Sequence, residues 1–269
     1  MSLLWRDQVR IGLGPDRLIF AGYQRGVHPR LVRKDIIEVH PDSAQLYWQA
    51  AIDALPAALA AFSPGKPDVT VVLSNCFVRY ALLSRNAAVR SEAEWLAIAR
   101  HRMTSVHGRI AEGWEIRVTE TVRNGPLIAC AVDSTLLDGL QAKVAEGRAA
   151  LSSVQPYLIA VFNRIRPKIS HESCWLLIEE PGCLMLVLIR SGQWLSIRCR
   201  HVDADWRAAF PEILERESAF LALDEPCTKV ILYTPTAFDA GACSGYQVRD
   251  LTLAGGAAPG DRPLAMALA

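Results

Sequence analysis

Glycine-containing turns beside carboxylates are the first candidates for chemistry in this 269-residue chain. One apolar run ends in Ile11-Gly12-Leu13-Gly14, and a second ends in Glu179-Glu180-Pro181-Gly182. Such turns bind phosphate through bare backbone N–H groups, and a nearby carboxylate holds the accompanying metal ion. The candidate cofactor-binding residues of a nucleotide site are therefore Gly12, Gly14, Glu180 and Gly182.

A second pattern, Gly241-Ala242-Cys243-Ser244-Gly245, has the spacing of a nucleophile elbow with cysteine at its centre. An elbow of this kind joins a strand to a helix, whereas Tyr246-Gln247-Val248 has the pattern of an extended segment. No histidine and acidic partner for Cys243 is assignable from the sequence. A hydrolase that uses Cys243 is the last of three hypotheses.

The composition is that of an ordinary globular protein, with 51% hydrophobic and 21% charged residues. Lysine and arginine number 29 against 28 aspartates and glutamates, which leaves a formal net charge of +1. A balanced charge gives no general attraction to nucleic acid or to an anionic membrane. We therefore expect no nucleic-acid partner.

Cysteine usage and hydropathy indicate the compartment. The seven cysteines have no C-x-x-C spacing and mostly lie in apolar runs, which is typical of reduced thiols in a cytosolic protein. Arg6 and Asp7 stand where a signal peptide would be apolar. The longest strongly apolar stretch, Leu184 to Ile189, is far shorter than the roughly 18 residues that cross a bilayer. We expect a cytoplasmic chain with no membrane span of its own.

Hydrophobic periodicity and turn residues predict the elements that would position these sites. In the first half, Ser91 and Glu94 have the spacing of a capping box at a helix start. Predicted strands lie at 8–13, 17–23, 31–39, 68–83, 114–122, 127–132 and 149–154, and predicted helices at 42–62, 91–110, 133–147 and from 156 onward. In the second half, predicted strands lie at 174–179, 183–190, 193–201, 229–234 and 247–253, with a helix at 205–223.

Three strands, a helix, a strand and a helix, repeated imperfectly in two halves, is the element order of the actin-like fold. We therefore predict an α/β (α+β) protein of two ribonuclease H-like lobes with mixed sheets flanked by helices. The predicted lobes are residues 1–153 and 154–269. The glycine-, alanine- and proline-rich end predicts a flexible tail from about residue 255.

Within this fold, an active ATPase needs a carboxylate after its first strand and glycines against the adenosine. Here Asp16 lies inside the turn after residues 8–13, and Thr234-Pro235-Thr236-Ala237 follows the strand that ends at Tyr233. Proline and side chains crowd the adenine position. The sequence thus predicts a degenerate, vestigial nucleotide site without metal or catalytic residues, and no cofactor, with Mg-ATP as the alternative.

Two segments resemble a known family. Val71-Val72-Leu73-Ser74-Asn75-Cys76-Phe77-Val78-Arg79-Tyr80-Ala81-Leu82-Leu83 resembles the "LSN-x-FVRY-x-LL" strand of proteins related to the type II secretion protein GspL and the type IV pilus protein PilM. Gln155-Pro156-Tyr157-Leu158-Ile159-Ala160-Val161-Phe162-Asn163 resembles the helix that enters the second lobe in that group. One departure is Ser84-Arg85, which stands where the family pattern has Pro-Trp.

The resemblance implies a cytoplasmic actin-like protein, peripheral to the inner membrane through a partner. The implied partner is a cytoplasmic segment of an inner-membrane protein of a pilus or secretion machine, bound in a groove between the lobes. Arg79 and Tyr80 are the partner-binding candidates, since they lie in the motif that carries the resemblance. Oligomeric state and the identity of the machine stay open.

Three functions follow in order of preference. The first is a non-catalytic actin-like scaffold, a pseudo-ATPase of a type IV pilus or type II secretion assembly. The second is an actin-like ATPase or sugar-kinase relative that uses Glu180 and the Gly12–Gly14 turn at the phosphates. The third is the hydrolase with Cys243 as its nucleophile.

Overall fold

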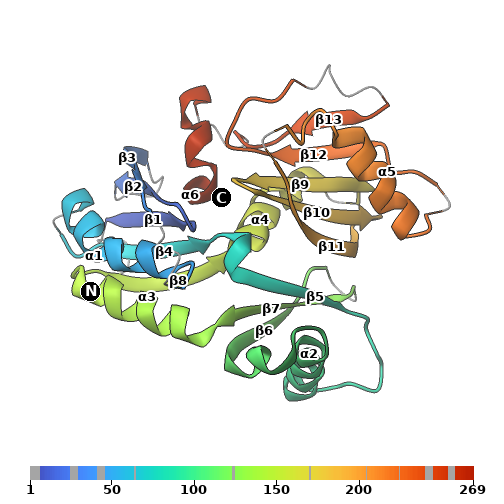
Figure 1. Cartoon of the computed structure of the whole chain (residues 1–269), viewed down its shortest axis with the longest axis horizontal. Coiled ribbons are helices and arrows are strands. Elements are labelled where there is room, and N and C mark those ends of the chain that lie inside the picture. The colour runs from blue at the N-terminus through green and yellow to red at the C-terminus, as the bar shows by residue number, and fades with distance from the viewer. Residues whose placement is uncertain are drawn as a thin grey trace.

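The computed structural model describes residues 7–24, 30–40, 46–63, 65–122, 125–169, 171–203, 205–223, 225–239, 245–253 and 258–269. Two five-stranded mixed sheets lie side by side, and a three-stranded sheet lies below the junction between them (Figure 1). Helices flank all three sheets. The predicted α/β class with mixed sheets and flanking helices is confirmed.

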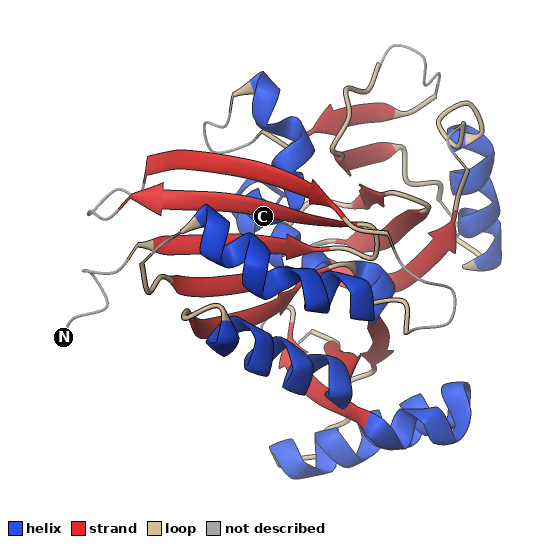
Figure 2. Cartoon of the chain, turned by 60° about the vertical axis from the view of Figure 1, so that its left-hand side comes forward, coloured by secondary structure: helices blue, strands red, loops and turns tan. Residues whose placement is uncertain are grey.

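The first sheet has the strand order β3-β2-β1-β4-β8. Its strands are β1 (Gln8–Leu13), β2 (Arg17–Gln24), β3 (Arg30–Glu38), β4 (Asp68–Leu73) and β8 (Ala150–Pro156). β1, β2 and β3 are antiparallel, whereas β4 and β8 run parallel to β1. Helices α1 (Gln49–Phe62) and α3 (Ser134–Glu146) lie next to each other on this sheet (Figure 2).

Side chains of β1 and β2 alternate between the two faces of the first sheet. On one face, Phe20 stacks on Phe62 of α1 with the ring centroids 5.1 Å apart. On the other face, Gly12 lies against Met266 near the end of the chain. The first sheet is therefore covered on both faces, by different parts of the chain.

The second sheet has the order β11-β10-β9-β12-β13 and is also buried on both faces. Its elements are β9 (Cys174–Glu180), β10 (Cys183–Arg190), β11 (Gln193–His201), β12 (Lys229–Tyr233), β13 (Gln247–Asp250) and helix α5 (Phe210–Phe220). Trp175 and Leu177 of β9 pack in the core that contains α5. Leu176 and Ile178 belong to the main core, together with α4 (Tyr157–Ile169) and the first sheet. Helix α4 thus joins the two large sheets.

The third sheet corrects one sequence prediction. The single strand predicted at 68–83 is wrong, because β4 ends at Leu73 and β5 (Val78–Leu83) enters the third sheet with β6 (Trp114–Glu120) and β7 (Leu127–Asp133). A 3-10 turn over Asn75–Phe77 separates the two strands. The turn closes because the Ser74 hydroxyl accepts a hydrogen bond from the Cys76 N–H at 3.1 Å. The Cys76 N–H is thus bonded to a side chain, whereas the continuous apolar pattern had suggested a bond to a neighbouring strand.

The end of the chain corrects a second prediction. A flexible tail from about residue 255 is wrong for residues 258–269, which form a 3-10 turn (Pro259–Leu264) followed by helix α6 (Ala265–Leu268). All four residues of α6 are buried, and Figure 1 shows α6 between the two large sheets. The small and apolar side chains of this segment suit close packing. Residues 254–257 lie outside the described residues.

Other boundaries differ by less. Helix α1 starts at Gln49 rather than at residue 42, with residues 41–45 outside the described set, and α5 covers only part of the predicted 205–223 helix. The lobe boundary near residue 153 stays a prediction. None of the helices in the described ranges has the length and hydropathy to cross a bilayer.

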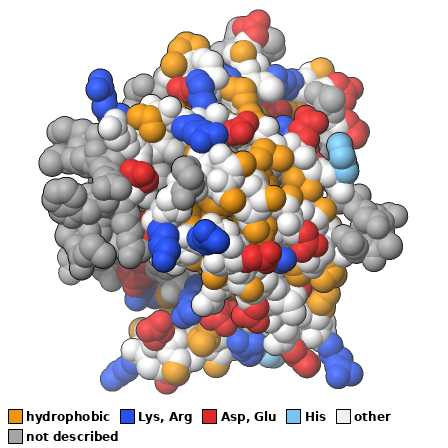
Figure 3. Space-filling view, turned by 90° about the vertical axis from the view of Figure 1, so that its left-hand side faces the viewer, with side chains coloured by type: hydrophobic (Ala, Val, Ile, Leu, Met, Phe, Trp, Pro, Cys, Tyr) orange, Lys and Arg blue, Asp and Glu red, His pale blue; other side chains and the backbone are white. Residues whose placement is uncertain are grey.

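The surface that carries the first sheet has a mixed character. Figure 3 shows acidic and basic side chains interspersed with hydrophobic ones on this face. Val32 and Ile36 of the edge strand β3 are among the exposed hydrophobic residues. Arg33, Lys34 and Asp35 lie between them on β3, and such charges are expected on an edge strand that must not pair with other chains.

Helix α2 (Glu92–His107) offers a test of the local encoding of the fold. The Ser91 hydroxyl accepts from the Glu94 N–H at 3.2 Å, and the Glu94 carboxylate accepts from the Ser91 N–H at 3.0 Å, so the predicted capping box is confirmed. We expect Ser91→Ala to lower the free energy of unfolding by about 1 kcal/mol in urea titrations. Ser105→Ala on the same helix is the matched control, because its hydroxyl bonds only the His101 carbonyl within the helix. Equal effects of the two substitutions would contradict the capping argument.

Candidate functional site

Turns from both large sheets meet at one small cavity. It is lined by the β1–β2 turn, by Ser74 after β4, by the β9–β10 turn, by Pro235 after β12 and by the C-terminal segment. Two of the predicted nucleotide-site residues, Gly14 and Glu180, come together there from sequence positions far apart. The cavity volume is about 30 Å³, which suits about one water molecule, whereas small-molecule sites measure roughly 300–1,000 Å³.

The other two predicted glycines do not line this cavity. Gly12 lies under Met266, and a Cβ placed on Gly12 would come within 3.0 Å of the Met266 Cβ and Cγ. Gly182 has φ +70° in the β9–β10 turn, a conformation that favours glycine, and lies beside His201. Both glycines are thus explained by close packing and turn geometry.

The C-terminal segment fills the junction between the sheets and is held from both sides. The guanidinium of Arg10 on β1 donates to the Ala269 carbonyl at 2.9 Å, and Arg164 on α4 donates to the Leu268 carbonyl. From the second sheet, the Tyr233 hydroxyl donates to the Ala265 carbonyl at 3.2 Å. These bonds satisfy the carbonyls at the end of a very short helix, which has no further turn to pair them. Met266 is thereby fixed against Gly12.

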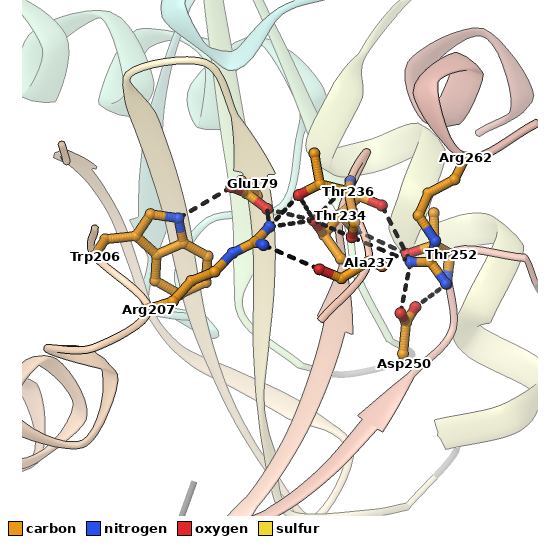
Figure 4. A network of polar contacts seen from close by, with 9 residues as sticks. All are labelled: Glu179, Trp206, Arg207, Thr234, Thr236, Ala237, Asp250, Thr252 and Arg262. Atoms are coloured by element: carbon orange, nitrogen blue, oxygen red, sulfur yellow. Dashed lines mark hydrogen bonds and ion pairs between the residues drawn. The ribbon is translucent and has the colours of Figure 1, made fainter. Parts of the chain in front are cut away.

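A polar network occupies the ends of β9, β12 and β13 (Figure 4). Glu179 is at its centre: its carboxylate accepts from the Trp206 indole at 3.0 Å and from the Arg207 guanidinium at 2.7 Å. The Thr234 hydroxyl also donates to Glu179. Arg207 reaches across to the Ala237 carbonyl at 3.0 Å, so it ties the end of β9 to the loop after β12. A charge-assisted network of this kind is stronger than its neutral equivalent.

The same loop is held from the C-terminal side. Arg262 forms an ion pair with Asp250 at 2.6 Å, and its guanidinium points toward the Thr236 carbonyl (Figure 4). The Thr234 N–H donates to the Thr252 hydroxyl at 2.8 Å. The loop Thr234-Pro235-Thr236-Ala237, which follows β12, therefore has a structural role. Its hydroxyls and carbonyls bind Glu179, Arg207 and Arg262.

Glu180 points into the protein. Its side chain accepts from the Asn75 N–H at 3.0 Å, and the residue is 4% exposed. Burial raises the pKa of this carboxyl from 4.5 to about 7, and the negative charge of the neighbouring Cys76 thiolate adds to the shift. Within the described part of the chain, no group of three His, Cys, Asp or Glu residues is arranged to hold a metal ion.

Asn75 is the site residue that sequence reasoning missed. Its side-chain carbonyl accepts from the Leu158 N–H at 3.0 Å, in the first turn of α4, and from the Tyr80 hydroxyl at 2.6 Å. Together with the Glu180 bond, Asn75 connects the end of β4, the start of α4, strand β5 and the second sheet. The available signal was the Ser74-Asn75 pair, since serine and asparagine inside an apolar run indicate side-chain bonds to the backbone.

Arg79 and Tyr80, the partner-binding candidates, make internal contacts. Arg79 donates to the Cys76 carbonyl at 2.9 Å and so closes the end of the Asn75–Phe77 turn. Burial raises the pKa of Tyr80, whose hydroxyl is bonded to Asn75. Their part in partner binding stays a prediction. Cys243 and the pair Gly255-Gly256 lie outside the described residues.

The buried carboxyl of Glu180 predicts a pH dependence of stability. Its folded-state pKa lies above that of the unfolded chain, so the folded state holds the extra proton between about pH 4.5 and about pH 7. Stability from this group is therefore full below that range and is lost as the pH rises through it, by about 2–3 kcal/mol between roughly pH 5 and pH 8. Glu180→Gln keeps an acceptor for the Asn75 N–H and does not titrate.

Urea unfolding of both proteins at the two pH values measures this effect. We expect the difference in unfolding free energy, native minus variant, to fall by about 2–3 kcal/mol on going from the lower to the higher pH. Parallel pH profiles for the two proteins would show that the Glu180 carboxyl is not perturbed.

Comparison with known proteins identifies the architecture. No protein-family model and no curated protein matches the sequence. A Bacteroides thetaiotaomicron protein of unknown function with an actin-like ATPase fold aligns with a TM-score of 0.61 and 12% identity, over 98% of this chain and 96% of its own.

Two further solved structures come from a type II secretion system and from a type IV pilus biogenesis complex. The cytoplasmic domain of EpsL, an inner-membrane component of the Vibrio cholerae type II secretion system, aligns with a TM-score of 0.61 and 10% identity over 97% of this chain and 94% of its own. The PilM-PilN type IV pilus biogenesis complex aligns with a TM-score of 0.60 and 12% identity, covering 84% of this chain and 80% of that chain. The predicted resemblance is confirmed at the level of the fold: this chain has the actin-like fold that EpsL and PilM also have.

Proposed function

We propose that this protein is a non-catalytic, cytoplasmic actin-like scaffold of a type IV pilus or type II secretion-like assembly. It binds a cytoplasmic segment of an inner-membrane partner and is peripheral to the membrane only through that partner. The observation that carries the proposal is the filled junction between the two sheets. Met266 lies over Gly12, and Arg207 is bonded to Glu179 and the loop after β12.

A nucleotide at this junction would have to displace several favourable contacts. It would have to move α6 away from β1 and break the Glu179–Arg207 ion pair, in which both side chains are largely buried. Breaking a hydrogen bond to a charged group costs about 1.5–3 kcal/mol, and a partner left buried and unpaired adds more. These costs support a junction that is used for rigidity rather than for nucleotide exchange.

Glu180, the carboxyl that the sequence suggested for a phosphate site, is poorly suited to bind a metal ion. Magnesium binds ionised oxygen ligands. Glu180, with its pKa raised to about 7 and its oxygen bonded to the Asn75 N–H, is only partly ionised at neutral pH.

The likeness to EpsL and PilM supports the partner class. EpsL is an inner-membrane component of a secretion system, and PilM is found in a complex with PilN. A fold shared with these proteins, together with a filled nucleotide position, favours recognition of another protein over turnover of a small molecule.

A groove between α4, the β10–β11 hairpin and the loop after β6 is the place we assign to the partner segment. Phe162, Ile169 and Ile189 form its apolar floor, and Arg166 and Gln193 are exposed at its rim. Its volume of about 390 Å³ lies within the range of binding sites for small groups, which suits one or two anchoring side chains of a short segment. Arg79 and Tyr80, the partner-binding candidates from the sequence, enter the proposal as residues that hold the turn over Asn75–Phe77 in place.

Isothermal titration with Mg-ATP separates this proposal from an actin-like ATPase. We expect no binding heat, because the junction is occupied by the chain itself. Binding at micromolar strength, lost in Glu180→Ala, would overturn the scaffold proposal and make the ATPase the better description.

A second titration tests partner binding. The cytoplasmic segments of membrane proteins encoded beside this chain are added as synthetic peptides, and we expect one of them to bind. Arg166→Glu should weaken that binding about tenfold or more, which corresponds to about 1.4 kcal/mol. Arg109→Glu, on an exposed turn away from the groove, is the matched control and should bind normally. Equal binding by both variants would move the site elsewhere, and no binding by any segment would end the scaffold proposal.

A further inference from the structure

Three thiols from three elements lie in contact behind the β9–β10 turn. Cys183 is the first residue of β10, Cys199 lies on β11, and Cys76 lies in the turn after β4. The Cys183 Sγ is 2.8 Å from the Cys199 Sγ and is also hydrogen-bonded to the Cys76 thiol. Cys183 is therefore within reach of two partners.

The sheet register keeps Cys183 and Cys199 on the same face. β10 and β11 are antiparallel, with Cys183 opposite His201 and Met185 opposite Cys199. The two cysteines are thus diagonal neighbours, two positions apart on paired strands, and their side chains project to the same side of the sheet. Cys199 is exposed, whereas Cys183 is buried.

The hydrogen bonds give the three thiols different chemistry. Hydrogen bonding with Cys183 lowers the pKa of Cys199 and lowers that of Cys76 to about 6, and the nearby Arg79 guanidinium contributes to both shifts. Burial raises the pKa of Cys130 and of Cys174 to about 12. The thiolate is the nucleophilic form of cysteine. Cys199 is exposed and has a lowered pKa, whereas the described cysteines outside this cluster are buried and have raised pKa values.

We infer that Cys199 and Cys183 form an oxidisable dithiol, with Cys76 as the exchange partner that carries the disulfide to the junction between the two sheets. The oxidant is a hydroperoxide. This inference goes beyond the proposed function and stands whether or not the chain is a scaffold.

The reaction proceeds in three balanced steps. The Cys199 thiolate attacks the hydroperoxide, the O–O bond breaks, and Cys199 sulfenic acid and an alkoxide or hydroxide form, which takes up a proton to leave as alcohol or water. The Cys183 thiol attacks the Cys199 sulfur, a disulfide forms, and its proton leaves with the sulfenic oxygen as water. The Cys76 thiolate then attacks the Cys183 sulfur, which forms a Cys76–Cys183 disulfide and releases the Cys199 thiolate.

The final disulfide would join elements from different sheets. Cys76 belongs to the turn that Asn75 anchors, and Cys183 directly follows the two-residue turn after Glu180. A covalent bond there would fix the first sheet to the second at the edge of the small cavity. Oxidation therefore removes whatever relative movement the Asn75–Glu180 hydrogen bond permits.

The test is disulfide mapping after hydrogen peroxide treatment. A Cys243→Ser background removes the one cysteine that lies outside the described residues, so that it cannot form disulfides with the others. Free thiols are blocked with N-ethylmaleimide, and non-reduced tryptic peptides are identified by mass spectrometry. We expect a Cys183–Cys199 linkage first and a Cys76–Cys183 linkage after longer incubation. Cys76→Ser should keep the first linkage and lose the second.

Cys183→Ser should abolish both linkages and leave Cys199 sulfenic acid, which dimedone traps. Cys174→Ser is the matched control and should behave as the parent. In the untreated protein, N-ethylmaleimide should label Cys199 at least about tenfold faster than Cys130 or Cys174. Absence of the Cys183–Cys199 peptide, or labelling of Cys199 at the rate of the buried thiols, would overturn the inference. Because Cys199 is exposed, Cys199→Ser also folds without disturbing the core and should yield no linkage to Cys183.

Discussion

The side chain and backbone of Asn75 hold together the parts of the molecule that define its central junction. Asn75 is 1% exposed and lies two residues after the end of β4. Its N–H donates to Glu180 of the second sheet, and its side-chain carbonyl accepts from the first turn of α4 and from Tyr80 of β5. Helix α4 passes between the two large sheets, so one amide fixes the start of the connecting helix, the entry into the third sheet and the nearest turn of the second sheet. Ser74 and Arg79 serve this arrangement by closing the two ends of the turn around Asn75.

In an ATPase of this fold, nucleotide and metal would bring charge to the junction, whereas here the chain supplies the charges itself. Glu179 is neutralised by Arg207, and Asp250 by Arg262, with side chains that are mostly shielded from solvent. Ion pairs with this degree of burial, supported by threonine hydroxyls and backbone carbonyls, are worth more than exposed pairs, because water screens them less. The pairs connect the end of β9, the loop after β12, β13 and the C-terminal segment (Figure 4). The carboxylates of Glu179 and Asp250 are thus both paired with arginines of the same chain.

Local patterns in the sequence predicted most of the elements, and the exceptions have a common cause. The capping box at Ser91, the three-stranded meander of the second sheet and the mixed α/β class all depend on near neighbours in the chain, and all are confirmed. The break after Leu73 is closed locally by Ser74 but is anchored to Glu180, 105 residues away, and the C-terminal segment is held by Arg10, 259 residues away. An asparagine in an apolar run indicates that its side chain needs hydrogen-bond partners. Only the folded structure identifies them, which for Asn75 are the Leu158 N–H and the Tyr80 hydroxyl. The candidate site followed the same division: Gly14 and Glu180 meet, whereas Gly12 is a glycine because Met266 arrives from the far end of the chain.

The same contacts explain why the fold would suit a scaffold. A nucleotide-driven protein of two halves must allow its junction to open, so the contacts across it have to be replaceable by a ligand. Here Met266, the Tyr233–Ala265 bond and the Asn75–Glu180 bond cross the junction directly, and each belongs to a buried side chain with its partner already in place. A junction bonded in this way holds the two sheets in one relation. Phe162 of α4 and Ile189 of β10 line the groove. Because both elements pack in the main core at the junction, the groove is held rigid as well. A preorganised groove loses less conformational entropy when a flexible segment binds, so the contacts that hold the junction rigid would favour the partner binding that we propose for this groove.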